Sequence, residues 1–341
     1  MNVNDTMTLF RPVGPKELEL IRASTSSEQS KSPRNSESES LRTMKVLFPN
    51  HPLKRRLPDP DYETELDAAR NAGFECELYS LEDLRGGDAA EATRLCSTAS
   101  RDGQAIVHRG WMMSESLYAA LFGALIAKGY RPLTTPEQYA QAHYLPNAYP
   151  LLQGRTPDSV WVEGKDVAAA WEKFEQLGRP AAIVKDFVKS AKHRWNEACF
   201  IQAGTERNRF NEILTAFLEA RRDQFEKGIV LRRFHDFVKL ADDIRGQPVH
   251  EEYRLFMWDG SLLAATPTMR ENGPFNDVAE WESIARKFAN RFISMDIARQ
   301  QDGSWLIVEV GDGGVSGLPS SIEPETFYRA LYDKMKAPAG K

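Results

Sequence analysis

The 341-residue chain is poor in cysteine, and its three cysteines, Cys76, Cys96 and Cys199, lie far apart. They form no CxxC pair and no spacing typical of a zinc site, and the histidines form no HExxH motif. These absences argue against a disulfide framework and against the common sequence-encoded zinc sites. Because the few cysteines suit a reducing compartment, we expect a cytoplasmic protein.

The chain also lacks a long apolar run and a strong excess of one charge. The longest run, Leu117 to Ala127, has 11 residues, whereas a bilayer-spanning helix needs about 20. We therefore expect a buried helix there and no membrane partner. The N-terminus shows no basic region followed by an apolar segment, so no signal peptide is expected. A net charge of −5 argues against a nucleic acid as partner.

Two signatures of nucleotide binding are absent as well. The predicted strand-to-helix turns carry no GxGxxG, which argues against a dinucleotide site. No GxxxxGK[ST] is present, which excludes a Walker loop. Any nucleotide site must therefore be built in another way.

Residues 1–43 read as a disordered tail, because Ser24 to Ser40 holds eight serines in 17 residues and little that could form a core. Residues 44–135 read as a parallel α/β unit, because strands alternate with helices. The predicted strands are 45–48, 75–79 and 105–108, and the predicted helices are 62–72 and 116–128. Arg109 follows the third strand, where open α/β sheets collect ligands, so it is either an anion contact or a structural ion pair.

The rest of the chain mixes antiparallel hairpins with helices, which indicates an α+β region rather than a second parallel unit. The predicted strands are 181–187, 228–234, 251–257 and 262–265, and the predicted helices are 209–225 and 279–292. We divide this region into a central subdomain, residues 136–235, and a C-terminal subdomain, residues 236–336.

The strongest single signal is an acidic hairpin near the C-terminus. Two alternating apolar runs, 293–298 and 305–310, flank Asp302-Gly303, a pair typical of tight hairpin turns. With these two residues in the turn, Asp296 lies opposite Glu309, about 5 Å away at Cβ. Two opposed acids require neutralisation, and a divalent cation would supply it. A surface hairpin with two solvated acids is the alternative. The other face, Met295, Ile297, Val308 and Val310, reads as core.

A second hairpin is predicted around Asp259-Gly260. Pairing Trp258 with Ser261 places Arg254 opposite Ala265. Arg254 shares its face with Glu252, and a guanidinium on a rigid strand suits bidentate binding of phosphate or carboxylate. A surface ion pair of Glu252 with Arg254 is the alternative.

Three further segments could complete a ligand site. Lys185 ends an apolar strand and opens a basic loop with Lys189, Lys192, His193 and Arg194, which could cover phosphates or be a solvated turn. Arg270 and Asn276 lie in a turn-rich polar loop. Residues 311–317, GDGGVSG, follow the acidic strand, and their glycines would let the backbone pass close to a bound group, with Asp312 as a third acid.

The order of these segments resembles the ATP-grasp superfamily, and most closely a small bacterial and phage clade of it. The matching pieces are the strand ending at Lys185, the strand 228–234, the hairpin with Arg254, and the strands carrying Asp296 and Glu309. The resemblance covers roughly residues 135–336. It implies a two-lobed ATP-grasp core, preceded by the α/β domain that usually accompanies it.

The resemblance also implies roles for individual residues. Lys185 would contact the α- and β-phosphates of ATP, and Arg254 the γ-phosphate and an acylphosphate. Asp296 and Glu309 would bind Mg²⁺, with Asp312 as a candidate third ligand. The backbone of the hinge would read adenine; its residues are Leu231, Arg232, Arg233 and Phe234.

Arg270 and Asn276 resemble the Arg and Asn of related ligases. The chain departs from the family pattern at Gly311, where many members have Asn, and at Arg232-Arg233, where an acidic residue usually holds the ribose. No lysine matches the first lysine of the core, and His143 and Arg155 lie in that region.

We therefore expect an ATP- and Mg²⁺-dependent carboxylate–amine ligase acting on a small-molecule or peptide acid and amine. A nucleotide-binding protein that does not ligate, such as a sensor or defence component, is the second reading. An unrelated α/β protein whose hairpin binds Ca²⁺ or nothing is the third. The oligomeric state is left open by the sequence.

Overall fold

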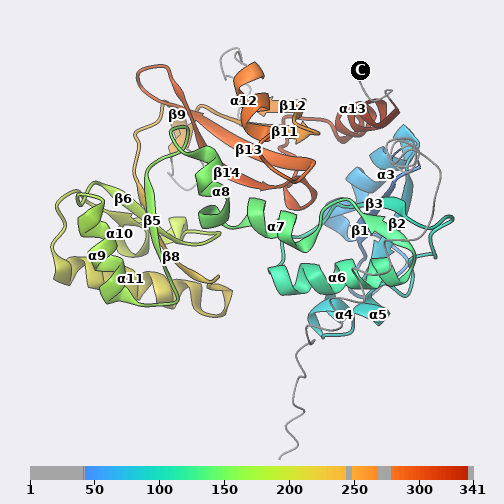
Figure 1. Ribbon diagram of the computed structural model, residues 1–341, viewed down its shortest axis with the longest axis horizontal. Helices are drawn as coiled ribbons and strands as arrows, with labels where there is room; N and C mark the ends of the chain where they lie inside the picture. Colours follow the sequence, from blue (N-terminus) through green and yellow to red (C-terminus); the bar gives the residue numbers. More distant parts are fainter. Residues whose placement is uncertain (1–40, 42, 243–247, 268–277, 337–341) are drawn as a thin grey trace, which may run out of the picture.

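The computed structural model describes residues 41, 43–242, 248–267 and 278–336. Three groups of elements follow one another along the chain (Figure 1): an α/β unit at the right, a sheet with its helices at the lower left, and a long antiparallel sheet above and between them. The mixture of one parallel and two antiparallel four-stranded sheets confirms the predicted fold class.

The first group is a four-stranded parallel sheet in the order β2-β1-β3-β4. Its helix α3 ends at Gly73, whose φ of 104° suits a glycine. The elements are β1 (Lys45–Pro49), α3 (Glu63–Ala72), β2 (Glu75–Tyr79), α4 (Leu81–Arg85), α5 (Ala89–Ala92), β3 (Gln104–His108), α6 (Glu115–Ala127) and β4 (Tyr130–Pro132), with the 3₁₀ helix η1 (Pro60–Tyr62) before α3.

The second group is a sheet in the order β5-β8-β6-β7, whose strand pairs are antiparallel. Its elements are α7 (Pro136–His143), α8 (Leu145–Leu152), β5 (Ser159–Glu163), α9 (Val167–Gln176), β6 (Ala182–Asp186), η2 (Lys192–Arg194), α10 (Trp195–Ala198), β7 (Phe200–Ile201), α11 (Arg207–Arg221), η3 (Arg222–Gln224) and β8 (Gly228–Arg233). One face packs on α9 and α11 through Val184 and Leu231. Since side chains alternate along a strand, the opposite face carries Lys185 and Arg232.

The third group is an antiparallel sheet in the order β12-β11-β13-β14, with a two-stranded ribbon beside it. Its elements are β9 (Lys239–Asp242), β10 (Pro248–His250), β11 (Glu252–Trp258), β12 (Ser261–Pro267), α12 (Val278–Ala285), β13 (Phe292–Arg299), β14 (Trp305–Asp312), η4 (Gly313–Val315) and α13 (Pro324–Lys336). The predicted helix 279–292 was too long. It ends at Ala285, and the side chain of Asn290 accepts a bond from the backbone N–H of Phe292 where β13 begins.

The turn of the acidic hairpin differs from its predicted form. Gln300 pairs with Ser304, the backbone N–H donating to the carbonyl at 2.8 Å. The loop therefore holds Gln301 as well as Asp302 and Gly303, and Gly303 has a φ of 86°. A three-residue hairpin loop with glycine in the left-handed region is a common alternative to a two-residue loop.

The predicted pairing of Asp296 with Glu309 is nevertheless confirmed. The register shifts between Asp296 and Ile297: Ile297 pairs with Ile307, so Val308 is an inserted bulge residue. The bulge compensates for the longer turn. It also corrects the predicted core face, because Ile307 is fully buried and Val308 is only partly buried.

The second hairpin has the predicted turn, with Trp258 paired to Ser261. Asp259 and Gly260 both have positive φ, 49° and 70°, as a mirror-image hairpin turn requires. A bulge farther along shifts the register by one, so Arg254 lies opposite Thr266 rather than Ala265.

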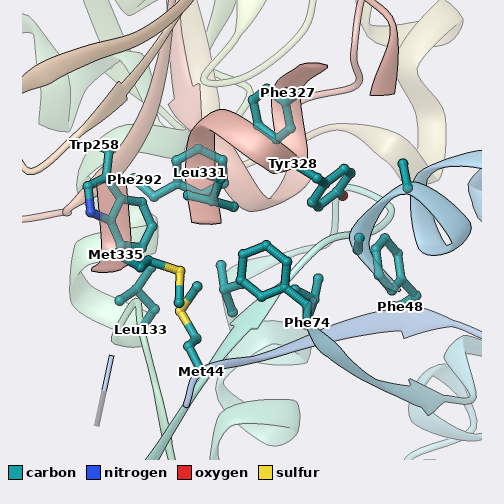
Figure 2. Close-up of a cluster of buried hydrophobic side chains, with 14 of the residues drawn as sticks. Met44, Phe48, Phe74, Leu133, Trp258, Phe292, Phe327, Tyr328, Leu331 and Met335 are labelled. Carbon is teal, nitrogen blue, oxygen red and sulfur yellow. The ribbon is translucent and has the colours of Figure 1, made fainter. Parts of the chain in front are cut away.

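The C-terminal helix α13 returns to the first group and closes its core (Figure 2). Phe327, Tyr328 and Leu331 are fully buried against β1 and α3, in one cluster with Phe48 and Phe74. This cluster also includes Leu41, which is 9% exposed, although the sequence assigned it to the disordered tail. The other residues of that tail, apart from Thr43, lie outside the described residues.

No helix in the described part of the chain has both the length and the apolar character needed to cross a bilayer.

Candidate functional site

A pocket of about 150 Å³ lies between the β13–β14 hairpin and the turn after β6. Small-molecule sites usually measure about 300–1,000 Å³, so in this conformation the pocket has room for a phosphate-sized group rather than a whole nucleotide. Its lining is Met112, His143, Val188, Lys189, Arg254, Ser294, Asp296, Glu309, Val310, Gly311, Val315, Ser316 and Gly317.

Asp296 is paired with Arg254 at one wall of this pocket. The two residues face each other in register on β13 and β11. Arg254 Nε donates to Asp296 Oδ1 at 2.8 Å, and Nη2 donates to Oδ2 at 2.7 Å. This fork raises the pKa of Arg254. Arg254 therefore forms a partly buried ion pair across the sheet, with the first acid of the other hairpin.

Glu309 is paired with Lys189, which comes from the turn after β6. Lys189 Nζ donates to Glu309 Oε1 at 3.0 Å, and both side chains remain partly exposed. Burial acts to raise the pKa of Glu309, but the ammonium groups of Lys189 and Lys185 outweigh it and lower the pKa to about 2. Glu309 is therefore ionised at neutral pH.

The turn that carries Lys189 is organised by Asp186, which the sequence reading did not single out. Asp186 is fully buried, and its Oδ1 accepts the backbone N–H groups of Val188 and Lys189 at 2.7 and 2.6 Å. Its Oδ2 accepts from Arg221 Nε at 2.8 Å. An acid two residues before a turn amide is the signal of an Asx turn, and it was available in the sequence.

Lys185 stands near these groups without a direct partner. Among the described residues, its ammonium makes no side-chain hydrogen bond or ion pair. Burial lowers its pKa to about 8, against the opposing effect of Glu309. A cation that is poorly hydrated and unpaired is suited to an anionic ligand.

The predicted hinge residues serve different purposes. Leu231 is buried in the core below the sheet. Arg233 forms an exposed ion pair with Asp158, its Nε 3.2 Å from Oδ2. Phe234 packs in an aromatic group with Trp195 and Phe200, at centroid distances of 6.0 and 5.2 Å.

Arg232 is buried, and its Nη2 donates to Thr156 Oγ1 and to the carbonyls of Ile307 and Val308. Its Nη1 is buried without a hydrogen-bond partner among the described residues. Burial lowers the pKa of Arg232 to about 10, partly offset by Glu309.

Asp312 is not brought to the pocket with Asp296 and Glu309. Its carboxylate is buried, accepts from Thr134 Oγ1 at 3.1 Å and from Asn290 Nδ2 at 2.7 Å, and caps the turn η4. The reason is strand alternation, since an odd separation from Glu309 places Asp312 on the other face.

The glycines after β14 are used mainly for packing of the protein itself. A Cβ on Gly313 would lie 2.7 Å from the ring of Phe292, and one on Gly314 would lie 2.4 Å from the carbonyl oxygen of His108. Gly311 and Gly317 do line the pocket, as expected for backbone that passes close to a ligand.

Arg109 is a structural residue rather than an anion contact. It is 1% exposed, and its Nη2 donates to Glu65 Oε2 at 2.7 Å. It also donates to the carbonyl of Ser316, so it joins the first group to the loop after β14. Arg270 and Asn276 lie outside the described residues.

His143 is a pocket residue to which the sequence reading gave no role. It is 6% exposed and stacks on Tyr139 at 4.8 Å. Burial lowers its pKa to about 4, so it is a neutral wall of the pocket. The one sequence signal for His143 was its position before the second sheet, in the region where no lysine matches the first lysine of the family's core.

The described residues contain no cluster of three or more His, Cys, Asp or Glu side chains that could enclose a metal ion. Asp296 and Glu309 nevertheless supply hard carboxylate oxygens at one pocket wall. Mg²⁺ is commonly bound by one or two carboxylates together with substrate phosphates. The donor set therefore fits Mg²⁺ bound jointly with a phosphate, and does not fit an all-protein cage.

Comparisons with known proteins bear on the family and the fold. Residues 176–331 match the family described as ATP-grasp domain, R₂K clade family 3. A search of curated proteins gives no match.

Among solved structures, the D-cycloserine synthetase DcsG aligns with a TM-score of 0.55 and 15% identity, over 86% of this chain and 99% of that one. The ATP-grasp ligase PsnB, complexed with precursor peptide PsnA2 and AMPPNP, aligns with a TM-score of 0.52 and 14% identity over 87% and 98%. A RimK domain ATP-grasp protein from Sphaerobacter thermophilus aligns with a TM-score of 0.51 and 14% identity over 85% and 98%.

At these identities the structural likeness establishes the fold alone. The family match covers the strands that carry Lys185, Arg254, Asp296 and Glu309. This chain has the ATP-grasp fold, and its residues 176–331 match the model of that ATP-grasp clade.

Proposed function

We propose that this protein is an ATP- and Mg²⁺-dependent carboxylate–amine ligase. The observation that carries the proposal is the pairing of Asp296 with Glu309 at a phosphate-sized pocket. Two cations, Lys189 and Arg254, line the same pocket, and a third, Lys185, lies close enough to lower the pKa of Glu309. Phosphoryl transfer depends on positioning and charge neutralisation more than on covalent help, and this set supplies both.

In the proposed reaction the γ-phosphoryl group of ATP is transferred to a substrate carboxylate oxygen, which gives an acylphosphate and ADP. The substrate amine then attacks the acyl carbon, inorganic phosphate leaves, and the amine nitrogen loses a proton to form the amide. Arg254 would hold the transferred phosphoryl group, and Lys185 and Lys189 the phosphates behind it. Bound Mg²⁺ would neutralise phosphate charge, held by Asp296 and Glu309.

We assign adenine to the backbone of residues 231–234, at the end of β8. The side chains of Leu231 and Phe234 are used in packing. Since β8 is paired with β5 on one side and β6 on the other, adenine would meet the main chain where it leaves the sheet after Arg233. Arg270 is a candidate second catalytic arginine, and Asp312 is better suited to capping its turn than to binding the metal.

The proposed substrate class rests on the ligase reaction above and on analogy with two proteins of the same fold. PsnB is described in complex with a precursor peptide, and DcsG as a D-cycloserine synthetase. We propose an acid and an amine that are either small molecules or parts of a peptide.

One observation favours a second function, nucleotide binding without ligation. Both carboxylates are already paired with cations, Asp296 with Arg254 and Glu309 with Lys189. A protein that used these cations in place of a metal would bind a nucleotide and release no ADP.

The test measures the thermal shift caused by ATP, with and without Mg²⁺, on the wild type and on Glu309→Ala. Ligand binding to the native state raises the melting temperature by mass action. We expect a shift that needs both ATP and Mg²⁺ in the wild type and that is lost in Glu309→Ala. Glu163→Ala, an exposed acid on β5, is the matched control and should behave as the wild type.

A wild type that gives no shift would overturn nucleotide binding altogether. Where the shift is present, ADP release is measured over a panel of acid–amine pairs. Release that depends on both an acid and an amine supports the ligase. Saturable ATP binding with no release from any pair supports the second function.

A further inference from the structure

The β-bulge in β14 decides which way Glu309 points. Counted from the observed pair of Gln300 with Ser304, a regular ladder would place Asp296 opposite Val308. Glu309 would then face Met295, which is fully buried in the core. A shift of one residue moves a side chain to the opposite face of a sheet. The insertion of Val308 therefore brings Glu309 to the pocket.

The bulge is held from outside the sheet by Arg232. Its Nη2 donates to the carbonyl oxygens of Ile307 and Val308, at 3.0 and 3.1 Å. In a regular strand consecutive carbonyls point in opposite directions, so one nitrogen could not bond both. Thr156 Oγ1 supports the same point, because it accepts from Arg232 at 2.8 Å and donates to the carbonyl of Ile307 at 2.7 Å.

The position and the burial of Arg232 suit it to holding the bulge. It lies on β8 of the neighbouring sheet and is 6% exposed, so its contact with β14 links the two sheets and is shielded from bulk water. β14 is an edge strand, and its outward carbonyls have no strand to pair with. Without the guanidinium, the carbonyl of Val308 would lose this donor and the carbonyl of Ile307 would keep only Thr156 Oγ1, so the bulge would be less favourable.

We propose that Arg232 is a positioning residue that keeps the Val308 bulge in place and thereby aims Glu309 at the metal and phosphate pocket. The proposal rests on the proposed function for the use of Glu309, but not for the contact itself. It gives the Arg232 side chain a task separate from the adenine contact assigned to its backbone. Arg232 makes no contact with a reacting atom in this scheme.

The first measurement needs no ligand. Hydrogen–deuterium exchange is followed for peptides covering β14 in the full-length wild type, Arg232→Met and Arg232→Lys. We expect exchange in β14 to be at least about tenfold faster in Arg232→Met, with Arg232→Lys in between, because its single amine can bond only part of the bulge. Arg209→Met, which removes an exposed pair with Glu212, is the control and should match the wild type.

The second measurement is Mn²⁺ affinity in the presence of a non-hydrolysable ATP analogue. Removing a residue that orients a metal ligand typically weakens metal binding about 10- to 100-fold. We expect that loss of Mn²⁺ affinity in Arg232→Met, with partial recovery in Arg232→Lys and with a smaller effect on the affinity for the analogue at saturating Mn²⁺. A merely structural residue would weaken both kinds of binding together.

The outcomes separate this proposal from the proposed function. If the wild type binds no nucleotide with Mn²⁺, the proposed function fails, while the exchange measurement still decides the role of Arg232. Unchanged exchange in β14, or altered exchange with unchanged Mn²⁺ affinity, overturns the positioning role. If Arg232→Met does not fold, Arg232→Lys and Thr156→Val carry the same two measurements.

Discussion

Arg254 and Asp296 face each other in register on β11 and β13, joined by two hydrogen bonds of 2.8 and 2.7 Å. The cation that neutralises the first acid of the hairpin is therefore supplied by the neighbouring strand. Since a forked pair of this kind orients both partners, it also holds Asp296 toward the pocket in the absence of a ligand.

This pair predicts a strong energetic coupling. We expect Arg254→Met to lower the free energy of unfolding by about 1–3 kcal/mol, because it leaves a mostly buried carboxylate without its donors. The double variant Arg254→Met/Asp296→Leu should lose less than the sum of the single changes. Urea denaturation measures all three, and additive losses would contradict the coupling.

Lys185 predicts a pH dependence of stability. Its pKa is about 8 in the folded protein and 10.5 as an ordinary lysine. Between these values the unfolded chain binds more protons, so folding stability rises with pH over this window and is lowest below pH 8. Relative to Lys185→Met, the wild type should gain about 1–3 kcal/mol from pH 8 to pH 10.5.

The Lys185 prediction is tested by urea denaturation of both proteins across that range. The comparison cancels the titration of the tyrosines and other lysines, which both proteins share. A difference in free energy that stays flat from pH 8 to pH 10.5 would refute the lowered pKa.

Gly314, next to the candidate site, has no room for a side chain. A Cβ there would lie 2.4 Å from the carbonyl oxygen of His108 and 2.6 Å from Asp312 Oδ1. We expect Gly314→Ala to lose about 1–3 kcal/mol, because backbone must move to admit the methyl group. Gly123→Ala, in α6 with open space around it, should gain up to about 1 kcal/mol. Melting temperatures of the two variants should therefore move in opposite directions.

The packing of helix α13 indicates that the first group of elements depends on this C-terminal helix for its stability. Leu331 is fully buried against β1 and α3, so Leu331→Ala should cost about 2–5 kcal/mol. Arg329→Ala, exposed on the same helix, should change stability by less than about 0.5 kcal/mol. Calorimetry gives both values.

The same packing predicts the behaviour of residues 44–135 produced alone. They should fail to show a cooperative transition, because α13 fills one side of their core. A stable isolated fragment would show that α13 is dispensable.

Local pattern was enough to predict much of the fold. Alternation of apolar residues located β2, β3, β8 and β11 to within a residue or so, because burial of one face or one segment is written directly into the sequence. The helix α12 was overextended, since apolar spacing does not show where a chain turns back into a strand.

The acidic hairpin shows which features cannot be predicted by counting residues along the chain. Asp296 does pair with Glu309, but through a longer turn and a bulge whose effects cancel. Turn residues predict that a hairpin forms, whereas an inserted residue such as Val308 depends on what lies outside the strand. Here that is Arg232, which is 76 positions away in the chain.

The secondary elements, the hairpins and the two acids of the candidate site could be predicted, because each depends on residues close together in the chain. Four features became visible only in the folded protein: what neutralises those acids, that Arg109 is a structural ion pair, that Asp312 faces away, and that α13 closes the first core. Each of these rests on contacts between distant segments, such as Lys189 with Glu309, 120 positions apart. Such contacts are selected by packing of the whole chain and leave no local periodicity to detect.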